Sequence, residues 1–136
     1  MGADDMLWRL VRATDEHDLE ALVDCFAADY VNETPAHPAR GFTGREQVRR
    51  NWSQIFTGVP DLRARVLRHV AEGDAVWSEW EMWGTRRDGA PHLMRGVIIF
   101  EVHDDRATAA RFYLEPVDQA PTDVNDAVRA AVGTTP

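Results

Sequence analysis

The sequence has one cysteine, no lysine and no apolar run long enough to span a membrane. Because Cys25 has no other cysteine to pair with, a secreted scaffold held together by disulfides is excluded. The fifteen cations, all arginine, are outnumbered by 23 Asp and Glu residues, which leaves a formal net charge of −8. Nucleic acids and anionic membranes need a basic surface that such a chain lacks. We therefore expect no nucleic acid and no membrane among its partners.

Patterns typical of targeting, metal binding and cofactor binding are also missing. The first residues show no basic segment followed by an apolar one, so the expected location is the cytoplasm. The five histidines form no HxxxH, HxH or Cys/His cluster, so no metal site is predicted. Without a glycine-rich phosphate loop or a GxSxG motif, we expect no cofactor. Cys25 lies in an apolar helical pattern and is expected to be a buried, inert thiol.

The hydrophobic pattern changes from helical to extended near residue 62. Before that point we expect helices over residues 4–11, 18–26 and 43–58, and a short strand over 28–34. A capping box of Thr43 and Glu46 is predicted to start the third helix. Four strands follow, separated by short turns, over residues 62–72, 75–86, 92–103 and 107–117. This order predicts an α+β domain over residues 1–117: a strongly curved, mostly antiparallel sheet with three helices on its concave side.

The predicted tail and core complete this interpretation. Residues 118–136 are expected to be a tail with a short helix, which Thr122 would cap and Gly133 would end. Six apolar residues of the domain are expected to be largely buried: Leu22, Phe26, Trp52, Ile55, Ile98 and Phe112. Residues 97–100 are apolar on both faces of their strand, so both sides of the sheet need a cover. We expect either Ile98 or Ile99, whichever points outward, to lie in the two-fold interface of a homodimer.

The last predicted strand carries the strongest candidate site. Arg111, Tyr113 and Glu115 share one of its faces, and a cation, a phenol and a carboxylate are costly to bury there unless they pair. If this face lines an apolar cavity, Glu115 would have a raised pKa and would act as general acid or base. Tyr113 and Arg111 would then donate hydrogen bonds to a developing enolate. The alternative is an ion pair of Arg111 and Glu115 that only stabilises the strand.

Aromatic residues on two other elements provide candidate walls for a ligand pocket. In the strand over 75–86, we expect Glu79 and Glu81 to face solvent and to pair with arginines of neighbouring strands. Trp80 and Met82 would then face the core or the pocket, and Trp52 and Phe56 of the third predicted helix would form the opposite wall for a flat hydrophobic ligand. Plain core packing is the alternative for each of these residues. Among the histidines, His37 in the proline-rich loop is the one expected to meet a ligand. His92 and Arg95, at the start of a predicted strand, are candidate rim residues.

Short motifs in a fixed order give the chain a family resemblance. They are Asp18-Leu-Glu-Ala-Leu22, Phe26-Ala-Ala-Asp29, Gly44-Arg-Glu46, Pro60-Asp-Leu62, Gly73-Asp74, Gly84-Thr85 and Arg111-Phe-Tyr113. Together they resemble the SnoaL-like branch of the NTF2-like superfamily, from about residue 4 to about residue 117. The resemblance implies a cone-shaped domain whose open end is a ligand pocket, and a dimer. It does not fix the function, because this superfamily includes isomerases, cyclases, dehydratases, epoxide hydrolases and non-catalytic binding domains.

The resemblance also bears on the last strand. SnoaL-like sequences often place Arg, Tyr and Asp at alternate positions there, and this chain has Arg111 and Tyr113 with Glu115 in place of Asp. The Gln-Leu-Gly run that often ends such domains is absent, and residues 116–121 take its place. Two functions stay open for a chain that is expected to bind a small hydrophobic molecule. One is a cofactor-free isomerase, cyclase or dehydratase, and the other is a ligand-binding or dimerisation module without turnover.

Overall fold

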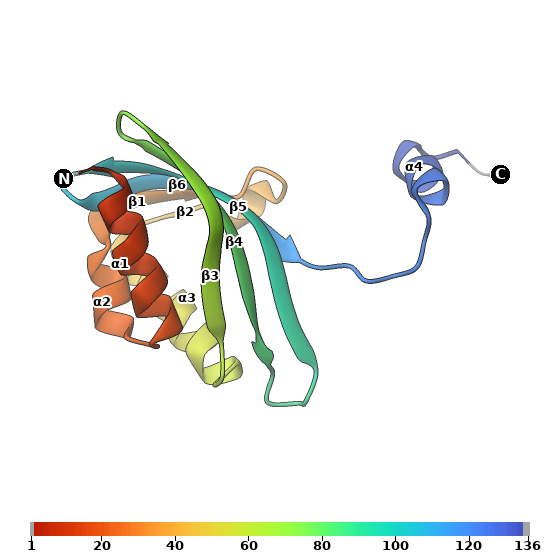
Figure 1. Ribbon diagram of the computed structural model, residues 1–136, viewed down its shortest axis with the longest axis horizontal. Helices are drawn as coiled ribbons and strands as arrows, with labels where there is room; N and C mark the ends of the chain where they lie inside the picture. Colours follow the sequence, from red (N-terminus) through yellow and green to blue (C-terminus); the bar gives the residue numbers. More distant parts are fainter. Residues whose placement is uncertain (1, 135–136) are drawn as a thin grey trace.

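The computed structural model describes residues 2–134 and contains a curved six-stranded sheet with helices on its concave side (Figure 1). Its elements are α1 (Asp4–Asp15), α2 (Leu19–Asp24), β1 (Phe26–Glu33), η1 (Pro38–Arg40), β2 (Phe42–Thr43), α3 (Arg45–Gly58), β3 (Arg63–Glu72), β4 (Ala75–Thr85), β5 (Pro91–His103), β6 (Arg106–Pro116) and α4 (Val124–Val132). The strand order is β2-β1-β6-β5-β4-β3. All neighbours are antiparallel except β1 and β6, which are parallel. The predicted α+β class and mostly antiparallel sheet are confirmed.

Three helices cover the concave side of the sheet (Figure 1). The apolar stripe of α1, with Met6, Leu7 and Leu10, is buried, because a helix of this pattern is stabilised by packing one face on a sheet. The Asp18 side chain caps α2 by accepting a hydrogen bond from the backbone N–H of Ala21 at 3.1 Å. Within the described residues, no helix has both the length and the apolar character needed to cross a membrane.

The helix α3 begins near the predicted position, but the predicted capping box of Thr43 and Glu46 is wrong. Thr43 pairs with Val31 in β2, and the N-cap of α3 is Gly44, with no side-chain capping bond. Gly44 has a φ of 103°, which glycine adopts readily, and this conformation turns the chain from strand into helix. Its N–H also donates to the Tyr30 carbonyl oxygen at 2.7 Å. The start of α3 is therefore set by the pairing of β2 with β1 and by the turn at Gly44, and not by a capping box.

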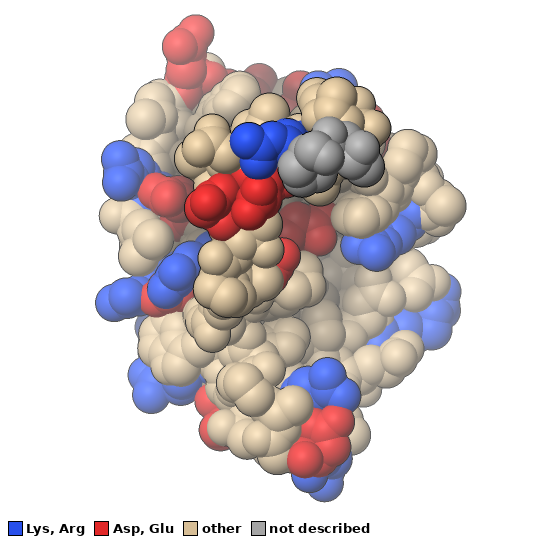
Figure 2. Space-filling view, turned by 90° about the vertical axis from the view of Figure 1, so that its right-hand side faces the viewer, with Lys and Arg blue, Asp and Glu red and all other residues tan. Residues whose placement is uncertain are grey.

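The tail after β6 contains the predicted helix. In Figure 1, α4 lies away from the sheet at the end of an extended segment, and every residue of α4 is exposed. Its N-cap is Asp123 rather than Thr122, and Gly133 ends it in the left-handed conformation as expected. Seen from the side on which α4 lies, the lower half of the molecule has uncharged side chains in its middle and charged ones toward its rim (Figure 2).

The core agrees with the prediction at three of the six positions. Leu22, Phe26 and Ile98 are at most 2 % exposed. The other three, Trp52, Ile55 and Phe112, are only half-buried and are partners at the edge of the core. Cys25 is buried, and burial raises the pKa of its thiol to about 11, which keeps it protonated and inert.

The two faces of β4 differ as predicted, with one exception. Glu79 forms an ion pair with Arg68 on the outer face, with 2.7 Å between its carboxylate and the guanidinium. Glu81 accepts from Arg65 at 2.6 Å and from Arg95 at 2.8 Å, so the expected pairing with arginines is confirmed. The two arginines leave only 8 % of Glu81 exposed, and its expected solvent exposure is therefore wrong.

Candidate functional site

A cavity of about 290 Å³ lies between α3 and the concave face of the sheet, and we call it the α3 cavity. Its apolar lining residues lie on α3 and on five strands of the sheet: Phe26, Phe42, Val48, Trp52, Ile55, Met82, Met94, Phe112 and Leu114. Its polar lining residues are Tyr30, Asn32, Thr34, Arg40, Asn51 and His92. A mostly apolar hollow with a few polar groups is the usual form of a small-molecule site, and this volume is at the lower end of the ~300–1,000 Å³ typical of such sites.

One wall of the α3 cavity has a buried hydrogen-bonded pair from β1. Tyr30 and Asn32 point to the same face because they are two residues apart in a strand. The Tyr30 hydroxyl is buried and donates to Asn32 Oδ1 at 2.7 Å. Burial raises the pKa of Tyr30 far above its usual value, so its hydroxyl stays a neutral donor.

The opposite wall has a second polar chain, on α3. Arg50 donates to Gln47 Oε1 at 2.7 Å, and Gln47 Nε2 donates to Asn51 Oδ1 at 2.8 Å. These contacts join residues three and four apart, which face each other on a helix. Asn51 is the member of this chain that lines the α3 cavity.

Within residues 2–134, no Asp or Glu side chain lines the α3 cavity. Its titratable lining groups are Tyr30, Arg40 and His92. Burial, with a smaller contribution from the Arg86 guanidinium, lowers the pKa of His92 below its usual 6.5. The imidazole of His92 is therefore neutral near pH 7 and is free to accept a proton.

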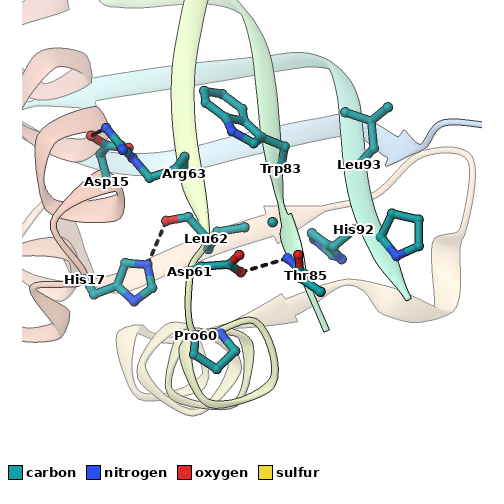
Figure 3. A pocket seen from close by; sticks show the side chains of 12 residues that line it. Asp15, His17, Pro60, Asp61, Leu62, Arg63, Trp83, Thr85, His92 and Leu93 are labelled. Carbon is teal, nitrogen blue, oxygen red and sulfur yellow. Dashed lines mark hydrogen bonds and ion pairs between the residues drawn. The ribbon is translucent and has the colours of Figure 1, made fainter. Parts of the chain in front are cut away.

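His92 also faces an open groove at one end of the sheet (Figure 3). The carboxylates of this groove are already engaged: Asp15 accepts from Arg63 at 2.8 Å, and Asp61 accepts from the Thr85 backbone N–H at 2.7 Å. His17 contacts the Leu62 carbonyl oxygen at 2.7 Å. Because these polar groups are paired within the protein and the groove is open, we take the α3 cavity as the candidate site.

Only two of the predicted wall residues, Trp52 and Met82, line the α3 cavity. Trp80 is buried in the core, where its indole N–H donates to Ser78 Oγ at 2.9 Å. The Phe56 ring stacks on the His17 ring with 4.5 Å between centroids. Trp80 and Phe56 therefore pack inside the protein and do not form walls of the α3 cavity.

The last strand has the predicted alternation, but the opposite face points inward. Phe112 and Leu114 line the α3 cavity, while Arg111 and Tyr113 line a hollow of about 480 Å³ on the outer face with Trp77 and Ile99. The expectation that the Arg111 face reaches a cavity bordered by α3 is therefore wrong. The physical reason is that the helices cover the apolar face of β6, since the two faces of a strand always point to opposite sides. Catalytic roles for Arg111, Tyr113 and Glu115 stay predictions and are not tied to this cavity.

Glu115 and Arg111 also have different partners from those expected. Glu115 Oε1 lies 3.0 Å from His37 Nε2, in the loop that contains η1. Arg111 lies 3.7 Å from the Glu33 carboxylate of β1. The alternative of an ion pair between Arg111 and Glu115 is therefore wrong. Neither His37 nor Glu115 lines the α3 cavity, so ligand binding by His37 stays a prediction.

Sequence reasoning missed five polar residues of the α3 cavity: Tyr30, Asn32, Thr34, Arg40 and Asn51. A signal existed for the first two, because residues 30 and 32 alternate on one face of a predicted strand. None existed for Asn51, which is polar in the middle of an amphipathic helix and is typical of a solvent-facing position.

Comparison with known proteins agrees with the fold. The sequence model of the SnoaL-like domain family matches residues 8–110 of this chain. A search of curated proteins finds no match. Among solved structures, wild-type IdmH from Streptomyces antibioticus, proposed to be a polyketide cyclase, is 23% identical, with a TM-score of 0.72 over 98% of this chain and 100% of that one.

Two further solved structures contain bound molecules. RV0760c from Mycobacterium tuberculosis, in complex with estradiol-17beta-hemisuccinate, is 17% identical, with a TM-score of 0.71 over 93% of this chain and 98% of that one. A protein of ketosteroid isomerase-like fold from Catenulispora acidiphila, in complex with trimethylamine, is 18% identical, with a TM-score of 0.69 over 96% of this chain and 93% of that one. At these identities, the three structures establish a shared fold and no shared activity.

Proposed function

Because this chain belongs to the family of SnoaL-like domains, we propose that it binds a small hydrophobic molecule in the α3 cavity. The observation that carries this proposal is the lining itself, in which apolar side chains from α3 and the sheet surround a few polar groups. Two proteins of the same fold, with trimethylamine in one and a steroid ester in the other, support small-molecule binding as a use of this architecture.

A cavity-filling substitution tests the binding site. The probe is ethylbenzene, titrated into the protein and followed by two-dimensional NMR. Leu114→Trp adds volume inside the α3 cavity, and we expect it to weaken ethylbenzene binding at least tenfold. The matched control is Leu67→Trp, because Leu67 is 45% exposed on β3. Unchanged binding by the Leu114 variant would place the ligand elsewhere and overturn the proposal.

For the reaction, we propose cofactor-free proton transfer, as in an isomerase, cyclase or dehydratase, with His92 as the base. His92 supports this role because its imidazole lies on the cavity wall and has a lowered pKa. If Glu115 were the base instead, with Tyr113 and Arg111 as donors, the substrate would have to bind outside the α3 cavity.

The alternative is a binding module without turnover, and the lack of a lining carboxylate within residues 2–134 favours it. Deuterium exchange into the methyl group of acetophenone, measured by NMR in heavy water, separates the two functions. An enzyme of the proposed kind accelerates this exchange, and His92→Gln should lower the acceleration by ~10²-fold or more. If acetophenone binds but its exchange is not accelerated, the binding module is the correct function.

We also propose a homodimer formed through the outer face of the sheet. Val70, Trp77 and Ile99 are cross-strand neighbours that form an apolar row there, with Val70 65% and Trp77 55% exposed. Ile99, rather than Ile98, points outward. Light scattering should give about twice the 15.4 kDa chain mass, and Trp77→Glu should return the chain mass. A monomer at all concentrations would overturn this proposal.

A further inference from the structure

Two polar side chains of the α3 cavity have the same orientation. They are the side-chain amides of Asn32 on β1 and Asn51 on α3, and each has its oxygen engaged by a neighbour behind it. An amide whose oxygen points to a neighbour behind it turns its NH₂ group the other way, and this group can only donate hydrogen bonds. The direction of each bond therefore determines what the cavity can recognise.

The direction at Asn51 follows from an arginine. A guanidinium has five N–H donors and no acceptor, so the Gln47 atom that faces Arg50 must be the oxygen. The Gln47 nitrogen then faces Asn51 and donates to Asn51 Oδ1. Reversing either amide would bring two donors together. Asn51 therefore presents Nδ2 as its free polar atom.

The direction at Asn32 follows from burial. Tyr30 is 1 % exposed, and its hydroxyl proton needs an acceptor because unpaired buried donors are costly. Asn32 Oδ1, at 2.7 Å, is that acceptor. If the amide were reversed, the hydroxyl proton would have no partner there. Asn32 therefore also presents Nδ2 to the cavity.

Resting on the proposed binding function, we propose that Asn32 and Asn51 form a donor site in the α3 cavity that selects hydrophobic molecules with a hydrogen-bond acceptor. The acceptor is a ketone, an ester, a carboxylate or an enolate, and it receives hydrogen bonds from Asn32 and Asn51. Arg40 adds positive charge to the same lining. An ammonium group placed at these two amides would meet only donors, and no carboxylate among residues 2–134 lines the cavity to neutralise it, so such a ligand is disfavoured. Tyr30 and Gln47 act as positioning residues.

The test uses three one-ring probes of the same skeleton: acetophenone, ethylbenzene and 1-phenylethylamine. Affinities are measured by NMR titration at pH 7 on the full 136-residue chain. We expect wild-type protein to bind acetophenone at least tenfold more tightly than the amine. Asn51→Asp replaces the donor by a carboxylate of the same shape, so acetophenone should lose at least fivefold in affinity and the amine should gain as much. Ethylbenzene has no polar group and should change less than twofold.

Two further variants complete the design. Asn125→Asp makes the same chemical change on the exposed helix α4 and should leave all three affinities unchanged. Tyr30→Phe releases the Asn32 amide to turn, so the preference for acetophenone over the amine should fall while ethylbenzene binding is kept. If no probe binds, the proposed function fails. If ethylbenzene binds, but acetophenone and the amine respond alike in every variant, only the donor assignment is overturned.

Discussion

The two faces of the sheet hold their polar side chains by different means. On the concave side the buried pairs are neutral: Tyr30 with Asn32, and Trp80 with Ser78. On the outer side they are ionic, as in the cluster of Arg65, Glu81 and Arg95 and in the pair of Arg68 and Glu79. Charges are costly to remove from water, whereas neutral donors and acceptors are tolerated inside when they are paired. This difference supports our proposal that the α3 cavity binds an uncharged or acceptor-bearing ligand.

The largest effect on stability is expected at Gly96, where the backbone of β6 leaves no room for a side chain. Gly96 pairs with Trp80 and Leu114 in the neighbouring strands and has a φ of 153°. A Cβ there would lie 2.0 Å from the Tyr113 carbonyl oxygen, so Gly96→Ala must distort the β5–β6 ladder. We expect a loss of at least about 2 kcal/mol in the free energy of unfolding, measured with urea. Gly58→Ala, which would meet nothing within 4 Å, is the control, and an equal loss there would refute this explanation.

A neutral pair inside should matter more than an ion pair outside. Ser78 Oγ donates to the Ile98 carbonyl oxygen at 2.7 Å and accepts from Trp80, and both side chains are about 1 % exposed. Ser78→Ala leaves the Trp80 N–H unpaired, and we expect a loss of about 1–3 kcal/mol. Glu79→Gln removes an exposed ion pair and should cost less than about 1 kcal/mol. Both variants are measured by thermal and urea unfolding. If they lose the same amount of stability, the two faces do not differ in this way.

The ion cluster of Glu81 with Arg65 and Arg95 should make the free energy of unfolding depend on pH in the acid range. Hydrogen bonds from Arg95 and then Arg65 hold the pKa of Glu81 below its usual 4.5. A lowered pKa in the folded state means that this contribution is present above pH 4.5 and is lost as the pH falls through the folded value. Glu81→Gln should therefore lose less stability between pH 7 and pH 3 than the unchanged protein. Glu72→Gln, at the exposed end of β3, should keep the full acid dependence.

The smallest effect on ligand binding is expected at Glu115. Its carboxylate is 3.0 Å from His37 and does not line the α3 cavity. Glu115→Gln should change the affinity for acetophenone less than twofold. If the same variant lowers deuterium exchange into acetophenone by ~10²-fold, Glu115 is the base after all, and the assignment to His92 is wrong.

The strands of the second half could be predicted because turn residues mark their ends. The turns at Gly73-Asp74 and Asp88-Gly89 set the bounds of β3, β4 and β5 to within a residue or two. The start of α3 could not be predicted in the same way, because Thr43 fits a capping box and a strand equally well. A tertiary pairing with Val31 decides between them.

The candidate site was less accessible to sequence reasoning. Alternation along β6 separates Phe112 and Leu114 from Arg111 and Tyr113, but it does not say which pair the helices cover. Asn32 and Asn51 meet at one cavity only because α3 packs across β1, and nothing in their spacing indicates this. The amide orientations depend further on Tyr30 and Arg50, which are contacts that only a folded chain contains.

Cys25 has a practical consequence for labelling chemistry. With its pKa near 11, about one thiol in ten thousand is ionised at pH 7, and the side chain is buried. A cysteine introduced at an exposed position, such as Asn125 on α4, would therefore react with a maleimide dye far faster than Cys25 does. The natural cysteine need not be removed, so energy transfer from the five tryptophans of the domain to a fluorophore on α4 would report how close the tail lies to the domain in solution.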